Sequence, residues 1–288
     1  MKILTLGDFH GKFPNELKSI IKKNNIDVVV SVGDYPTFSL GKLFFKYVYG
    51  NKNAYLWDFV GKERYKQLVL KDIKRGENVL KKLNELPVPV ISALGNHDYP
   101  HADDVMDVKK SKKDWNWDWN RTWHFSKFID KLDNVHKIDY SSFKLGDYIF
   151  VGARGHSFPG RVKSKAYARS RRKLEELFRN FSKENKQGKV ILVTHVPLYK
   201  TRLDLITAKD AHEKARGKHY GSKLFRRIVE KYQPILHLCG HIEESKGVQK
   251  IRKTTSVNSG SVHHGEFAVI DIDGPKSKIK SIKFHKIR

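Results

Sequence analysis

The 288-residue chain is poor in cysteine and has no long apolar run. Cys239 is its single cysteine, so no disulfide can form within the chain, which is typical of proteins of the reducing cytoplasm. No run approaches the roughly 18 apolar residues that a membrane-spanning helix needs. The apolar segment after Met1 is too short for a secretory signal. We therefore expect a cytoplasmic protein that does not enter a membrane.

Acidic residues are scarce as well. The chain has 57 Lys and Arg but only 31 Asp and Glu, a formal net charge of +26. A charge of this size draws anions to the surface. One interpretation is a polyanionic partner, nucleic acid above all, which residues 161–173 would contact because they carry seven basic residues and no acid. The other is a lysine-rich composition spread over solvated helix faces.

The hydrophobic residues, 39% of the chain, suit a globular protein and are gathered in short runs. Five of these runs have the length of a buried strand and end in Asp, His or Asn. They are Ile3–Leu6 before Asp8 and His10, Val28–Val32 before Asp34, Val88–Leu94 before Asn96, His97 and Asp98, Val190–Thr194 before His195, and Ile235–Cys239 before His241. Ligands and catalytic groups gather at the carboxyl ends of strands in α/β folds. One such residue would indicate only a turn, but five indicate a site, and oxygen and imidazole donors suit Mn, Fe, Zn or a similar ion.

The order of the predicted elements indicates an α/β fold. A helix over residues 14–24 lies between the first two strands, which predicts a parallel pair with a right-handed crossover. We expect one domain over residues 1–288 with insertions at about 35–86 and 99–134. The first insertion is rich in aromatic residues, for which core packing is the default interpretation and base stacking the alternative.

The motifs Asp8-x-His10, Gly33-Asp34, Gly95-Asn96-His97-Asp98, His195 and Gly240-His241 resemble, in order and spacing, those of the calcineurin-like metallophosphoesterase superfamily. They extend over residues 1 to about 245. The segment from Gly221 to Gly247, followed by Asn258-Ser259-Gly260, is similar to prokaryotic and especially archaeal members. The resemblance implies a four-layer α-β-β-α sandwich of two mixed sheets with insertions.

The resemblance also implies a centre of two divalent metal ions. Asp8 and His10 would hold the first ion, and Asp34 would bridge both. The second ion would be held by Asn96, His195 and His241. A metal-bound hydroxide would attack the phosphorus of a phosphate ester, whose charge the two ions neutralise. His97 resembles the family's general acid, with a role in orienting the substrate as the alternative, and Asp98 is expected to shape the turn.

Two positions depart from the family pattern. Thr37 stands where many members have an Asp that supports the catalytic histidine. Glu243 stands where the last motif, Gly-His-x-His, has its second histidine. Glu243 either ligates the first ion or points away and leaves its place to water. As a ligand it would make the shell richer in oxygen, which favours Mn, with Fe, Zn, Ni and Mg as the alternatives.

These observations predict a metal-dependent hydrolase of phosphate esters, with a phosphorylated anionic substrate and a slight preference for phosphodiesters. A nuclease acting on DNA or RNA is the first alternative, since it would use the same chemistry together with the basic surface. A non-catalytic binding module on a decayed metallophosphoesterase fold is the second. The near-complete set of ligands argues against decay. The sequence pattern carries no signal for the oligomeric state.

Overall fold

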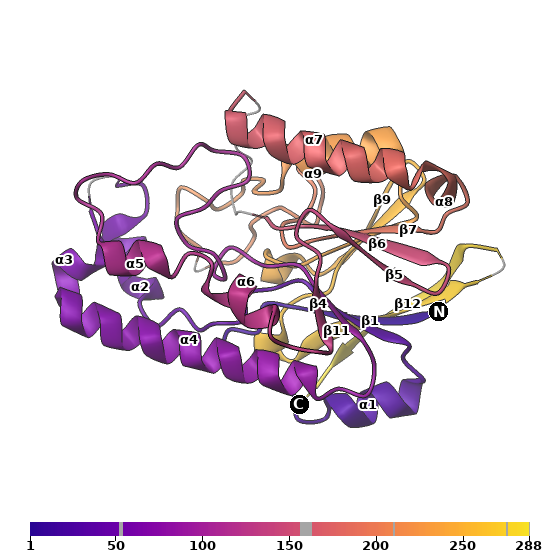
Figure 1. The fold of residues 1–288 in the computed structure, drawn as a ribbon, viewed down its shortest axis with the longest axis horizontal. Helices are drawn as coiled ribbons and strands as arrows, with labels where there is room; N and C mark the ends of the chain where they lie inside the picture. The colour runs from indigo at the N-terminus through magenta and orange to yellow at the C-terminus, as the bar shows by residue number, and fades with distance from the viewer. Residues whose placement is uncertain (52–53, 156–162, 210, 275, 288) are drawn as a thin grey trace.

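In the computed structural model, two six-stranded mixed sheets pack face to face, and helices cover their outer sides (Figure 1). The structure describes residues 1–51, 54–155, 163–209, 211–274 and 276–287. The first sheet has the order β12-β11-β1-β2-β3-β4. Its strands are β1 (Lys2–Leu6), β2 (Val28–Ser31), β3 (Val90–Ser92), β4 (Val135–Lys137), β11 (Glu266–Asp273) and β12 (Lys278–Lys286). The strands from β1 to β4 are parallel, and β11 runs antiparallel to β1.

The second sheet has the order β5-β6-β7-β8-β10-β9. Its strands are β5 (Ser142–Leu145), β6 (Tyr148–Ala153), β7 (Val190–Thr194), β8 (Leu236–Cys239), β9 (Gly247–Ile251) and β10 (Thr254–Asn258). Strands β6, β7, β8 and β10 are parallel, whereas the edge strands β5 and β9 are antiparallel. Both sheets are therefore mixed, as predicted.

Three apolar layers separate the sheets and helices. Between the two sheets lie side chains such as Val30, Ile91 and Leu238. A second layer, which includes Leu80 and Leu83, packs the first sheet against helices α1 and α4. A third, which includes Leu174 and Ile228, packs the second sheet against α7 and α9. Helix, sheet, sheet and helix thus form four layers, and the predicted α-β-β-α sandwich is confirmed.

The helices of the described residues lie outside the sheets (Figure 1). They are α1 (Leu17–Asn24), α2 (Gly41–Leu43), the π-helix η1 (Phe44–Val48), α3 (Leu56–Val60), α4 (Lys62–Asn84), α5 (Asn116–Asn120), α6 (His124–Ile129), α7 (Lys165–Asn180), α8 (Ser182–Lys186), α9 (Lys223–Tyr232) and the 3₁₀ helices η2 (Glu243–Ser245) and η3 (Val262–His264). Among the described residues, no helix is long and apolar enough to cross a membrane.

Most predicted elements are present with shifted ends. The first helix begins at Leu17 rather than at Pro14, because the Leu17 amide closes a turn on the Pro14 carbonyl at 3.2 Å before the helix starts. The predicted insertion of residues 35–86 contains α2, η1, α3 and α4, and that of residues 99–134 contains α5 and α6. The assignment of residues 1–288 to one domain stays a prediction.

Candidate metal centre

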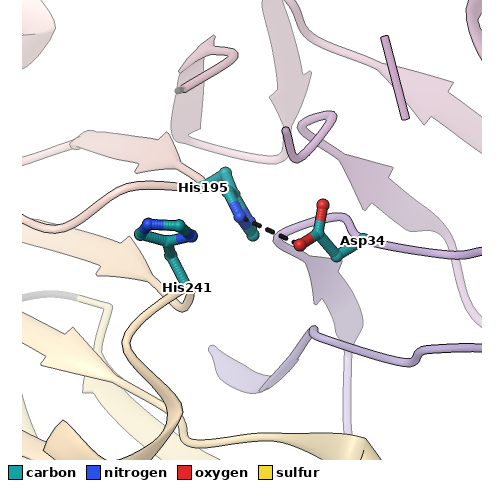
Figure 2. Close-up of side chains that lie close together, drawn as sticks. All are labelled: Asp34, His195 and His241. Carbon is teal, nitrogen blue, oxygen red and sulfur yellow. Dashed lines mark ion pairs between the residues drawn. The ribbon is translucent and has the colours of Figure 1, made fainter. Parts of the chain in front are cut away.

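The strand-end residues converge at one end of the two sheets. They follow the parallel strands β1, β2, β3, β7 and β8, whose carboxyl ends point the same way. Asp34, His195 and His241 form one group (Figure 2), and Asp8, His10 and Glu243 form a second. Within each group the possible ligand atoms lie within 4.8 Å of one another.

The other two predicted residues adjoin the first group. Asn96 Oδ1 lies 2.9 Å from Nε2 of His195, and His97 Nε2 lies 4.0 Å from Oδ2 of Asp34. The chain thus brings all eight predicted site residues together, although they come from positions as distant as 8 and 243.

Glycines make room for the carboxylates. A Cβ on Gly95 would lie 2.2 Å from Oδ1 of Asp34, and a Cβ on Gly240 would lie 2.3 Å from Oδ2 of Asp8. Any residue with a Cβ in place of Gly95 would therefore overlap the Asp34 carboxylate, and any such residue in place of Gly240 would overlap that of Asp8. Asp8, Asp34 and His241 themselves have positive φ of 52°, 60° and 71°, which costs free energy for a residue with a Cβ. Strain of this kind is frequent where side chains must converge on a ligand.

The tautomer of His195 leaves a lone pair facing the group. Its Nδ1 lies 2.7 Å from the carbonyl oxygen of Val32, to which only an N–H can donate. The neutral ring therefore presents an unprotonated Nε2, the form that ligates metals. That Nε2 meets Oδ1 of Asn96 at 2.9 Å and Oδ2 of Asp34 at 3.4 Å. In this neutral form three acceptors face one another with no hydrogen between them, an arrangement that either a second proton on the ring or a metal cation satisfies.

The pKa values show the same demand for positive charge. Burial lowers the pKa of His195, but the charge and hydrogen bond of Asp34, the charge of Asp8 and the bond to the Val32 carbonyl together outweigh burial and raise this pKa to about 9. Burial also lowers the pKa of His10, and the hydrogen bond with Glu243 together with the nearby carboxylates raises it to about 9. The raised pKa values mean that both imidazoles hold a proton firmly, and a bound metal ion would supply the positive charge that these protons supply here. The donors therefore fit divalent cations, since carboxylate, amide and imidazole groups suit such ions.

The carboxylates of the two groups differ. Burial raises the pKa of Asp8 to about 7. Burial acts in the same direction on Asp34, but the charges of His195 and His97 hold the Asp34 pKa well below its usual range. Asp34 is therefore the more firmly ionised of the two aspartates.

Asp98 holds two strand ends in place. Its buried carboxylate accepts the backbone N–H groups of Asp34 at 2.8 Å, Tyr35 at 2.9 Å and Gly95 at 2.7 Å. These bonds tie the loop after β2 to the loop after β3. Asp98 acts on the turn, as the sequence indicated, and keeps Asp34 beside Asn96.

The side chain of Thr37 has a partner on helix α4. Its hydroxyl donates to the Asp72 carboxylate of α4, which also accepts the Ser39 amide at 2.9 Å. The half-buried ring of His97 instead packs on Phe38, with the ring centroids 5.0 Å apart. Burial is the main cause of a lowered pKa for His97. An aromatic ring thus packs against His97, whereas the Thr37 side chain is bonded to Asp72.

Glu243 lies among the ligands rather than away from them. Its Oε1 is 3.0 Å from Nε2 of His10, and its Oε2 is 3.2 Å from Nδ1 of His264. Sequence reasoning missed His264, because it ends no strand and belongs to the 3₁₀ helix η3. The only signal for His264 in the sequence was its place in the pair His263-His264, which follows shortly after the Asn258-Ser259-Gly260 motif.

Seven of the eight predicted residues, all except the fully buried His195, line a cavity of about 1890 Å³. This volume exceeds the roughly 300–1,000 Å³ of pockets that hold small ligands. The described part of the basic segment, residues 163–173, contributes no residue to the cavity lining. Its basic side chains are exposed, and those from Lys165 onward belong to α7. Arg161 lies outside the described residues.

Comparison with known proteins agrees with this geometry. Residues 1–244 match the family model described as calcineurin-like phosphoesterase. The chain is 25% identical over 264 residues to the uncharacterised protein MJ1162 of Methanocaldococcus jannaschii, an alignment that covers 90% of this chain and 87% of that protein. The predicted similarity to archaeal members is thereby confirmed.

Solved structures share the fold at low identity. One crystal structure superposes with a TM-score of 0.66 and 17% identity, covering 99% of this chain and 98% of the other. The crystal structure of the protein TT1561 of Thermus thermophilus gives a TM-score of 0.53 at 15% identity, covering 100% and 99% of the two chains.

Proposed function

Because this chain belongs to the calcineurin-like phosphoesterase family, we propose that it hydrolyses phosphate esters with two divalent metal ions and that phosphodiesters are its preferred substrates. The observation that carries the proposal is the pair of adjacent ligand groups, Asp34–His195–His241 and Asp8–His10–Glu243. Two bound ions would neutralise the charge of the phosphate and lower the pKa of a water molecule between them.

The protein's own residues would divide the work. Asp34, a member of the first group, would contact both ions. Asn96, His195 and His241 would complete the ligands of one of them. The oxygen-rich second group, with two carboxylates and one imidazole, favours Mn over Zn. His97 would donate a proton to the leaving oxygen. A bound phosphate brings negative charge beside its ring and so favours the protonated form that donation requires.

The size of the cavity supports a diester. Besides the ligand groups, its lining includes Phe44 and His263, and its volume of about 1890 Å³ is far larger than one phosphate group. The cavity therefore has space for two organic groups bonded to a phosphate at the ligand groups, as a phosphodiester requires. A monoester would leave the space of one of these groups filled only with water.

Metal reconstitution tests this proposal. The purified chain would be stripped with a chelator, reloaded with Mn²⁺ or Zn²⁺, and assayed on bis(p-nitrophenyl) phosphate and p-nitrophenyl phosphate. We expect no hydrolysis without metal, faster hydrolysis with Mn²⁺, and a higher kcat/KM for the diester. Metal binding without turnover of either ester would instead indicate a non-catalytic binding module, and a higher kcat/KM for the monoester would contradict the diester preference.

A further inference from the structure

The large cavity continues beyond the ligand groups, along a wall of aromatic rings. Starting at His97, ring centroids are separated by 5.0 Å to Phe38, 5.6 Å from Phe38 to Phe44, and 6.1 Å from Phe44 to Tyr49. Phe45 flanks the wall, 5.3 Å from Phe44, and its side chain is 49% exposed. An exposed aromatic surface that begins at the reacting centre offers apolar contacts to a group bonded to the phosphate.

The far end of the wall is closed by polar rings. Tyr49 and Tyr220 share a hydrogen bond between their hydroxyls at 2.8 Å, and the ring of His212 lies 4.9 Å from that of Tyr49. One hydroxyl donates to the other, so the pair keeps one O–H and several lone pairs for another partner. All three side chains line the cavity. An alkyl chain here would cover these polar atoms without bonding them, at a cost in free energy.

Positive charge accompanies the rings. Lys42 and Lys46 are exposed, line the cavity and flank Phe44 and Phe45 in sequence. Lysine acts as a point charge for phosphate groups. Rings for stacking, hydrogen-bonding groups at the far end and cations along the edge together match a nucleotide better than they match a lipid.

We propose that this wall is a nucleobase subsite, and that the phosphoester hydrolysed at the centre carries a nucleoside. The inference rests on the proposed function for the reaction itself. The base stacks on one of the rings of Phe44 and Phe45, which lie at 78° to each other, and contacts the other, while its heteroatoms bond to the hydroxyls of Tyr49 and Tyr220. Such a substrate is either a small nucleotide or the end of a nucleic acid chain.

Binding of two probes that differ only in the base tests the subsite. Adenosine 5′-monophosphate and ribose 5-phosphate would be titrated calorimetrically into the Mn²⁺-loaded chain, with phosphate release followed in the same samples. We expect the adenosine probe to bind at least about fivefold more tightly, the lower end of what base–aromatic stacking gives. Equal affinity for the two probes would overturn the proposal.

Ring variants locate the effect. Phe44→Leu keeps an apolar side chain without a ring, and Phe45→Ala changes a residue that is 49% exposed and is not part of the apolar core. In both variants the affinity ratio of the two probes should fall toward one. Phe59→Ala is the matched control, since Phe59 is 46% exposed in the same insertion but does not line the cavity. An unchanged ratio in both Phe44→Leu and Phe45→Ala would refute the stacking role.

Further probes identify the source of the base. Octyl phosphate that binds more tightly than adenosine 5′-monophosphate would overturn the nucleobase assignment and indicate a lipid substrate. A single-stranded oligoadenylate of five nucleotides that binds about tenfold more tightly than the mononucleotide would support the proposal with nucleic acid as the source, and equal affinity would support it with a small nucleotide.

Hydrolysis of bis(p-nitrophenyl) phosphate by the same preparations tests the proposed function separately. Base-dependent binding without any hydrolysis would leave the nucleobase subsite standing and remove the hydrolase. Hydrolysis without base-dependent binding would support the hydrolase and overturn the nucleobase subsite.

Discussion

Replacing Gly95 with alanine should damage the metal centre far more than the fold. The added Cβ would lie 2.2 Å from Oδ1 of Asp34 and 2.7 Å from the Asp34 amide nitrogen, whereas Cβ contacts below 3.0 Å essentially do not occur. The carboxylate must therefore move by at least about 0.8 Å. The backbone has little freedom to give way, because Asp98 Oδ2 holds the amides of both Gly95 and Asp34, at 2.7 and 2.8 Å.

The size of the effect follows from this displacement. Metal–ligand distances are normally kept within about 0.2 Å, so a displaced Asp34 should lose much of its hold on metal. A misplacement of about 1 Å can cost about 10²-fold in rate, and we expect a loss of at least that size in kcat/KM. Overpacking costs about 1–3 kcal/mol of folding free energy, which should lower the Tm by several degrees without preventing folding.

The assay combines metal analysis after dialysis, thermal unfolding, and hydrolysis of bis(p-nitrophenyl) phosphate. Gly274→Ala is the matched control, since nothing lies within 4 Å of a Cβ at that position. If Gly95→Ala keeps the metal content and kcat/KM of the parent, then Asp34 does not approach the centre in the way described, and the reasoning is refuted.

Three further predictions follow from the same geometry. Glu243→His should shift the metal preference from Mn toward Zn or Fe and raise activity near neutral pH, because it removes one negative charge from the ligands around Asp8 and His10. If Glu243→His and Glu243→Ala both keep the metal content and pH profile of the parent, Glu243 is not a ligand. His97→Ala should reduce kcat by about 10²–10⁴-fold on esters with poor leaving groups and by much less on p-nitrophenyl esters, which need no protonation; an equal loss on both would assign His97 to orienting the substrate. His237 is fully buried between Thr194 and Ser256, and burial lowers its pKa to about 3. Below about pH 6.5 the unfolded chain therefore takes up a proton that the folded chain does not, and the free energy of unfolding should fall by up to about 1.4 kcal/mol per pH unit. Denaturant unfolding at pH 4–7 should give a smaller dependence of this free energy on pH in His237→Gln, and the same dependence in both proteins would contradict the assignment.

The sequence was sufficient for most of the fold and for the convergence of the site. Short apolar runs that end in Asp, Asn or His report the carboxyl ends of buried strands, and parallel strands bring those ends together. The runs before Asp8, Asp34 and His195 therefore indicated both the sheets and the cluster. Helix ends were less certain, as the start of α1 at Leu17 shows, because a local turn competes with the first helical turn.

What the sequence could not supply depends on contacts between distant segments. Asp72 bonds to Thr37 across 35 positions, and His264 reaches Glu243 from a short 3₁₀ helix that has no apolar periodicity. The aromatic residues of η1 show neither a clean helical nor a strand pattern, since η1 is a π-helix. Only the three-dimensional arrangement reveals that Phe44 and Tyr49 form a wall facing Tyr220.

The number of divalent ions bound per chain tests the central claim most directly. Elemental analysis of the Mn²⁺-loaded protein after dialysis should give two ions for the parent and for Asp118→Asn, a matched control whose buried carboxylate belongs to neither ligand group. Asp34→Asn should retain at most one ion and should not hydrolyse bis(p-nitrophenyl) phosphate, because it weakens the residue proposed to join both groups. Two ions and full activity in Asp34→Asn would contradict the account.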